Sequence, residues 1–245
     1  MRNIKMIIQY DGSRYYGWQR LGDTDKTIQG KIEGVLKRMT DEDIEIVGAS
    51  RTDAGVHAIN QVANFHTNCD KPIEYMLDFC NRYLPKDIVI SDMREVKERF
   101  HSRYNAKAKK YLYRIWNGRF HDPFFGKYSY HISREMNIDL MRQAGNNLVG
   151  EHDFTSFTTL KSKKKSKVRK VYSIDIDKRG DMVEIMFYGK GFLYNMVRIM
   201  TGTLIEVGLE KIKPDSMADI LKGMDRSLAG PTVPPHGLVL YEVEY

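Results

Sequence analysis

One aspartate in this chain has neighbours that suit it for chemistry. Asp53 lies within the run Gly48–Ala58, with Arg51 two residues before it and Gly55 two residues after it. A nearby guanidinium favours the charged form of a carboxyl group, so we expect Asp53 to be ionised near neutral pH. An ionised carboxylate can act as a base, a metal ligand or a nucleophile, and Asp53 alone does not decide among the three.

Apolar and β-branched residues lead into this run and out of it. The stretches Ile44–Val47 and Gln61–Phe65 predict two strands, which places Asp53 on the loop that joins them. A loop anchored by strands at both ends holds a side chain rigidly, and functional residues are frequent on such loops.

The rest of the first half is expected to complete the order strand, helix, strand, strand, helix, strand. Its remaining elements are predicted at residues 4–10, 28–39, 73–84 and 88–90. Thr27 is a candidate helix cap, Asp11-Gly12 is a turn signal, and Pro85 is expected to end the second helix.

The second half predicts strands and helices in a looser order. Strands are expected near residues 110–116, 171–177, 182–188 and 238–245, and helices near 138–148, 193–207 and from 214. Mixed elements without a strict β-α-β rhythm favour an α+β fold with mainly antiparallel sheets covered by helices. We expect two similar lobes, residues 1–104 and residues 105–245, with an active-site cleft between them.

The positive charge of the chain is concentrated in the second half. The net charge is +7; residues 1–104 hold 16 basic and 16 acidic side chains, whereas residues 105–245 hold 23 and 16. Lys161–Lys170 alone contains seven basic residues. This indicates a polyanionic partner, nucleic acid ahead of membrane, with the ten-residue segment as a phosphate-contacting arm. The alternatives are a solvated charge run and a pI near 9.2 that simply favours solubility.

Several other classes of protein are disfavoured. No apolar run approaches the roughly 20 residues of a membrane-spanning helix, and the N-terminus lacks the apolar block of a signal peptide. Cys69 and Cys80 are too far apart for a CxxC motif and have no histidines at metal-ligand spacing, which favours two reduced thiols in a cytosolic protein. Walker A, HExxH and GxSxG motifs are absent.

Two features of the second half could contact RNA. Aromatic and basic residues alternate over Lys109–Arg114, which predicts a strand that could stack a base on Tyr111; for Tyr113 we favour ordinary sheet packing. Arg198 lies between apolar residues of a predicted helix, where it needs a carboxylate or phosphate partner unless its stem extends to solvent.

Segments along nearly the whole chain resemble, in the same order, those of the tRNA pseudouridine synthases of the TruA family. The most specific is Arg51–Ala58, RTDAGVHA. The others are Tyr10–Gly12 with Tyr16–Gln19, Lys109–Tyr111, Gly150–Phe154 and Gly191–Arg198. Ser50 departs from the family, which usually has glycine at that position.

The resemblance implies an isomerase that converts uridine to pseudouridine at positions 38 to 40 of the tRNA anticodon arm. It implies a cytoplasmic homodimer that uses no metal and no organic cofactor. Asp53 is then the catalytic carboxylate, as nucleophile or as base, and Arg198 is expected to pair with it. Tyr111 is expected to stack on the target uracil. Arg51 is expected to fill the gap left by the extruded base or to contact the backbone, and His57 to contact the substrate.

Two other functions compete with this one. A non-catalytic RNA-binding module could use the same basic half and aromatic residues, but it gains nothing from an enclosed carboxylate that faces a polyanion. A metal-dependent phosphoesterase would need several clustered carboxylates or histidines, whereas Asp53 stands alone. We rank the binding module second and the phosphoesterase last.

Overall fold

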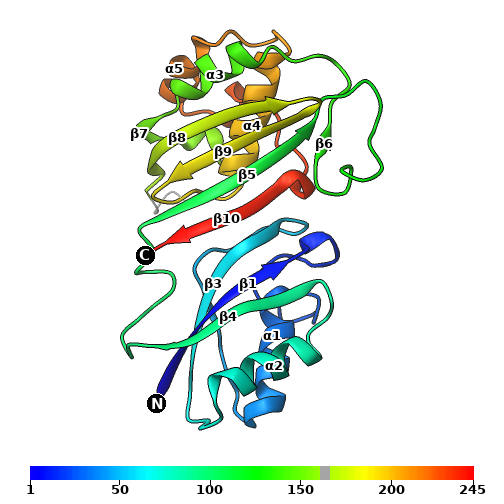
Figure 1. Ribbon diagram of the computed structural model, residues 1–245. Helices are drawn as coiled ribbons and strands as arrows, with labels where there is room; N and C mark the ends of the chain where they lie inside the picture. Colours follow the sequence, from blue (N-terminus) through cyan, green and yellow to red (C-terminus); the bar gives the residue numbers. More distant parts are fainter. Residues whose placement is uncertain (161–165) are drawn as a thin grey trace. The chain divides into compact units, whose positions relative to one another are not determined.

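The computed structural model describes residues 1–160 and 166–245, which form two compact units (Figure 1). The first unit contains residues 1–107 and 239–245, and the second contains residues 108–238. The predicted boundary after residue 104 is therefore three residues early, and the end of the chain does not belong to the second lobe. The reason is that β10 (Leu238–Glu244) pairs in parallel with β3 (His57–Thr67).

The first unit is a sheet covered by two helices on one face (Figure 1). Its strands follow the order β4-β1-β3-β10, with β2 paired to β3. Apart from β10 on β3, the pairings are antiparallel. The other elements of this unit are β1 (Arg2–Tyr10), β2 (Val47–Gly48), β4 (Ile88–Val96), α1 (Ile28–Thr40) and α2 (Ile73–Tyr83).

The apolar pattern that predicted these elements forms the core between sheet and helices. Ile4, Met6 and Ile8 of β1 and Ile32 and Leu36 of α1 are fully buried. Alternate residues of a strand and every third or fourth residue of a helix share a face, so both patterns bury a single side of their element. The predicted order of elements in the first half is confirmed.

Thr27 caps α1, as the sequence predicted. Its Oγ1 accepts a hydrogen bond from Gly30 N–H at 3.2 Å, and the side chain is fully buried. We expect Thr27→Ala to lower the free energy of unfolding by about 1 kcal/mol, because a helix amide loses its acceptor. Urea unfolding measures this change. Thr27→Ser keeps the oxygen, and if it destabilises the protein as much as alanine does, the cap is not the cause.

The second unit is a four-stranded antiparallel sheet in the order β5-β9-β8-β7, with the short β6 parallel to β5. Its strands are β5 (Ala108–Trp116), β6 (Tyr130–His131), β7 (Gly150–Asp153), β8 (Val168–Arg179) and β9 (Met182–Gly189). Its helices are α3 (Ile138–Asn146), α4 (Met196–Gly208) and α5 (Ser216–Gly223). The α+β class with mainly antiparallel pairing is confirmed.

Two predictions for the second unit differ from the structure, and a third falls partly outside the described residues. β6 and β7 are not predicted, because two to four residues are too short to show an alternating pattern. The helix predicted over 193–207 begins at Met196, because Asn195 has a left-handed backbone with φ of 59°. The first half of the basic segment, residues 161–165, lies outside the described residues.

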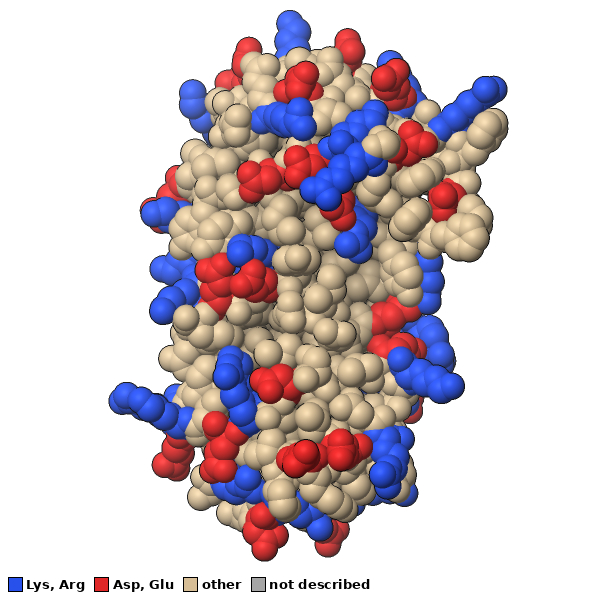
Figure 2. Space-filling view, in the orientation of Figure 1, with Lys and Arg blue, Asp and Glu red and all other residues tan. Residues whose placement is uncertain are grey.

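Charges of both signs are interspersed over the face drawn in Figure 2, so this face has no continuous basic patch. Within the residues that the structure describes, no helix is both long and apolar enough to cross a membrane.

Candidate active site

Residues 49–56, here called the Asp53 loop, join β2 to β3 as predicted. The segment after β1 holds this loop through its backbone. Trp18 N–H donates a hydrogen bond to Thr52 O at 3.0 Å, and Gly55 N–H donates to Tyr15 O at 3.3 Å. Residues on both sides of Asp53 are thus fixed to one neighbouring segment, so the backbone of Asp53 has little freedom.

Side chains from β1 and β3 also hold the Asp53 loop. The hydroxyls of Thr52 and Tyr10 lie 2.8 Å apart in the interior. Gln61 is fully buried; its Nε2 donates to Ser50 O at 2.8 Å, and its Oε1 accepts from Ser50 N–H at 3.3 Å. A buried amide with both ends engaged fixes the loop's entry. Asp53 itself is half-buried and Arg51 is exposed.

Ser50, where the family usually has glycine, does not have a positive φ. A side chain therefore causes no backbone strain at this position. The two hydrogen bonds between Ser50 and Gln61 use only the backbone of Ser50, so they do not depend on which side chain stands at this position.

Two glycines of the first unit are required by the close approach of the Asp53 loop. Gly17 has φ of +100°, and a Cβ there would lie 2.6 Å from Thr52 O. A Cβ on Gly12 would lie 2.0 Å from Val56 O. The sequence indicated a turn at Asp11-Gly12, and the structure shows that both glycines make room for the backbone of the Asp53 loop.

His57, expected to contact the substrate, lies inside the first unit and is 4% exposed. Its Nδ1 accepts a hydrogen bond from Gly12 N–H at 3.0 Å. Asp11 Oδ1 lies 3.2 Å from the same ring nitrogen. Asp11 Oδ1 also accepts from the backbone N–H and the hydroxyl of Ser13. His57 therefore holds the turn against β3.

Tyr15 anchors the segment that contacts the loop. Its hydroxyl donates to Asp87 Oδ1 at 2.5 Å, and burial and this hydrogen bond raise the pKa of Tyr15 above its usual value. Tyr15 therefore stays protonated and structural.

In the second unit, Tyr111 lies on β5 and is 7% exposed. The ring of Phe192 meets it edge-on, with centroids 5.4 Å apart. Tyr113 is fully buried, its hydroxyl donates to Pro234 O at 2.8 Å, and burial raises its pKa. Tyr113 is thus a packing residue, as expected.

Arg198 is half-buried on α4 and does not simply extend into solvent. Its Nε donates to Val233 O at 2.8 Å, and its Nη1 donates to Asn195 Oδ1 at 3.0 Å. These bonds fix the plane of the guanidinium. The expected pairing of Arg198 with Asp53 stays a prediction.

The cysteines agree with the sequence analysis in having free thiols. Cys80 is buried, and burial raises the pKa of its thiol to about 12, so it is a poor nucleophile. Over residues 1–160 and 166–245, no three His, Cys, Asp or Glu side chains are grouped as metal ligands would be.

The sequence of this chain is similar to one protein family and to several individual proteins. A family model described as tRNA pseudouridine synthase matches residues 6–105 and 144–245. The "tRNA pseudouridine synthase A 2" of Bacillus cereus (strain ZK / E33L) is 50% identical over 246 residues, which is 100% of both chains. The "tRNA pseudouridine synthase A" of Bacillus sp. (strain KSM-64) is 53% identical over 94% of each chain. The "tRNA pseudouridine synthase A 1" of Clostridium tetani (strain Massachusetts / E88) is 50% identical over 100% of both chains.

A solved archaeal box H/ACA sRNP Nop10-Cbf5 complex is similar over 83% of this chain and 43% of that one, at 12% identity with a TM-score of 0.39, which is too low to support an argument. The family match extends over both units and includes Asp53 and Arg198, whereas Tyr111 lies between its two matched segments. No finding favours the RNA-binding module without activity. The chain belongs to the tRNA pseudouridine synthases, the isomerases that convert uridine to pseudouridine in tRNA.

Proposed function

We propose that this chain isomerises uridine at positions 38 to 40 of the tRNA anticodon stem-loop, with Asp53 as its catalytic carboxylate. The observation that carries the proposal is the fixed backbone of the Asp53 loop, held by Trp18, Tyr15 and the buried Gln61. Such a loop presents one half-buried carboxylate in a fixed position, which a reaction at a single sugar carbon requires.

The reaction rearranges bonds without loss of atoms. The bond between uracil N1 and ribose C1′ breaks, the base rotates, and a bond forms between C5 and C1′. The proton on C5 is then lost, and N1 gains one. The Asp53 carboxylate can begin this sequence as a nucleophile on the sugar or as a base that removes a sugar proton, and both routes remain open.

The other site residues are assigned supporting roles. Arg198, whose guanidinium is fixed by Val233 O and Asn195, pairs with Asp53 and keeps it charged. Arg51, which is exposed, contacts the RNA backbone or the gap left by the flipped nucleotide. His57 acts as a positioning residue rather than a substrate contact, because its ring is buried against Gly12.

Tyr111 is proposed to stack on the target uracil, with its hydroxyl in the final proton movement. We expect Tyr111→Phe to lower kcat about 10²-fold, because the ring and its contact with Phe192 remain while the hydroxyl is lost. Rapid-quench assays with unmodified tRNA measure this rate. Tyr113→Phe serves as the matched control on the same strand. A wild-type rate for Tyr111→Phe would deny the hydroxyl any part in the chemistry.

Incubation with an unmodified tRNA transcript, followed by mapping of pseudouridine at each nucleotide, tests the reaction and its position together. We expect modification at positions 38 to 40 alone. Modification elsewhere would contradict the anticodon-arm assignment, and none at all would contradict the proposed reaction.

A homodimer in the cytoplasm is proposed on the family resemblance, and analytical ultracentrifugation tests the oligomeric state.

A further inference from the structure

A hollow of about 190 Å³ lies beside the Asp53 loop, within the first unit. Pockets for drug-sized ligands measure about 300 to 1,000 Å³, so this one suits part of a single nucleotide. The side chains that matter in its lining are Trp18, Glu45, Arg51, His101, Arg103 and Tyr104. Apart from Arg51 and Trp18, none of them has a role in the function proposed above.

Two guanidinium groups line this hollow. Within the part of the chain that the structure describes, neither Arg51 nor Arg103 has a carboxylate at ion-pair distance. Glu45, an exposed residue at the same hollow, is the one acidic side chain in its lining. The hollow therefore has a net positive charge, and arginine presents a planar set of donors that matches phosphate oxygens.

An aromatic platform stands next to the arginines. The ring of Tyr104 stacks on the ring of His101, with centroids 4.1 Å apart and planes at 28°. Tyr104 is nevertheless 79% exposed. One face of its ring is supported by His101, so the other face is available for a nucleic acid base, and base–aromatic stacking tolerates any base.

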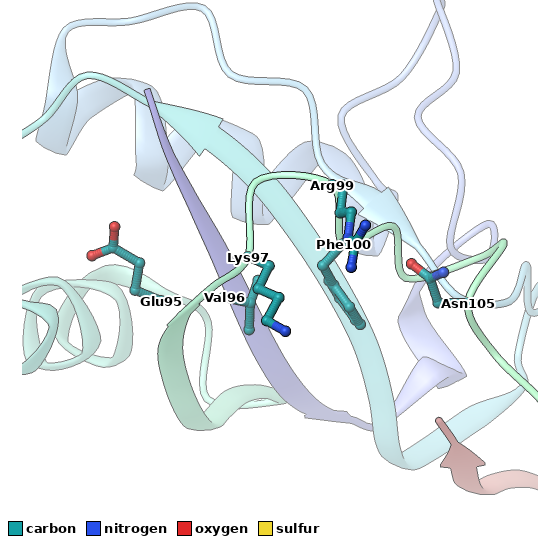
Figure 3. A pocket seen from close by; sticks show the side chains of 6 residues that line it. All are labelled: Glu95, Val96, Lys97, Arg99, Phe100 and Asn105. Carbon is teal, nitrogen blue, oxygen red and sulfur yellow. The ribbon is translucent and has the colours of Figure 1, made fainter.

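The segment that bears this platform is rigid. His101 Nδ1 lies 3.2 Å from both Arg103 N–H and Tyr104 N–H and accepts from them, and His101 N–H donates to Asn105 Oδ1 at 2.7 Å. Upstream, Asn3 Nδ2 donates to Phe100 O at 2.8 Å. Figure 3 shows Phe100 and Asn105 on this segment, around a separate hollow of about 540 Å³ after β4. A platform fixed before binding loses little entropy when a ligand arrives.

The hollow is adjacent to Asp53 along the chain and in space. Arg51 precedes Asp53 by two residues, a span of at most about 7 Å. Trp18, another lining residue, donates its backbone N–H to Thr52 O. The hollow therefore lies close to the backbone of Asp53.

We infer that this hollow binds one nucleotide of the substrate RNA next to the target uridine, with its phosphate on Arg51 and Arg103 and its base on Tyr104. The inference rests on the proposed function for the identity of the RNA.

The test compares binding of an unmodified tRNA transcript over a series of salt concentrations. Tyr104→Ala should weaken binding about tenfold without changing the salt slope, since a stacked base is lost but no phosphate contact. Tyr104→Phe should bind as the wild-type chain does. Arg103→Gln should weaken binding and reduce the slope of log K against log salt by about 0.7 to 1.

Matched controls are Tyr75→Ala and Arg94→Gln, an exposed tyrosine on α2 and a partly exposed arginine on β4, neither of which lines the hollow. In turnover assays the two hollow variants should raise KM and leave kcat nearly unchanged, because the hollow does not touch the reacting atoms.

If Tyr104→Ala and Arg103→Gln bind tRNA as their controls do, the hollow does not bind a nucleotide. Weaker binding by Arg103→Gln with an unchanged salt slope would also overturn the phosphate contact. Failure of the proposed function is distinguishable, because it would appear as absence of pseudouridine with the wild-type chain, whatever the two variants bind.

Discussion

We expect the Asp53→Asn variant to form no detectable pseudouridine and still to bind unmodified tRNA nearly as tightly as the wild-type chain. The amide has the shape of the carboxylate, so the Asp53 loop and its backbone bonds to Trp18 and Tyr15 remain. It has neither the charge nor the basicity that either mechanism requires, so the rate should fall by at least about 10³-fold.

Release of tritium from tRNA labelled at C5 of uridine measures this loss, because C5 gives up its hydrogen when it bonds to C1′. Asp70→Asn is the matched control, since it removes one exposed carboxylate from the same unit without touching the Asp53 loop. Measurable turnover by Asp53→Asn, or equal losses in both variants, would end the catalytic assignment of Asp53.

The second large effect is expected from Gly17→Ala, although Gly17 takes no part in the chemistry. A Cβ at φ of +100° is strained and would lie 2.6 Å from Thr52 O and 3.1 Å from the carbonyl carbon of Asp53. The strain costs about 1 to 3 kcal/mol of folding free energy. Relief of the contact must shift the Asp53 backbone, and a shift near 1 Å at a reacting group costs about 10²-fold in rate.

Thermal unfolding and single-turnover rates, measured on the same preparation, separate these two effects of Gly17→Ala. Gly22→Ala is the control, because a Cβ at Gly22 has no heavy atom within 4 Å. A Gly17→Ala protein that is destabilised but has a normal rate at saturating tRNA would show that the loop position does not depend on this glycine.

The order of elements could be predicted from the sequence because its signals are local. Alternation in β1, helical spacing in α1 and the oxygen of Thr27 each act within a few residues. The place of β10 could not be predicted, because its parallel pairing with β3 joins Val239 to His57 across most of the chain. No local pattern encodes such a pairing.

The candidate site was predictable in part for the same reason. Asp53 and its loop are contiguous in sequence, and the motif around them is specific. Gln61 had a weak signal, an amide within an apolar strand pattern, since a buried amide must find hydrogen-bond partners. The burial of His57 and the clearance required at Gly17 depend on segments that approach from elsewhere in the chain.

The platform of His101 and Tyr104 gave no signal in the sequence at all. It consists of two rings three residues apart, stacked only because His101 Nδ1 accepts the amides of Arg103 and Tyr104. A sequence pattern shows neither this turn nor the hollow of the first unit beside it.

The most direct test of the account is a crystal structure of the wild-type chain bound to tRNA, in which the distance from the Asp53 carboxylate to the Arg198 guanidinium is measured. We expect an ion pair, with the carboxylate facing the ribose of a flipped uridine whose base rests on Tyr111. An Asp53 side chain directed into bulk solvent, away from both Arg198 and Tyr111, would contradict the central claim.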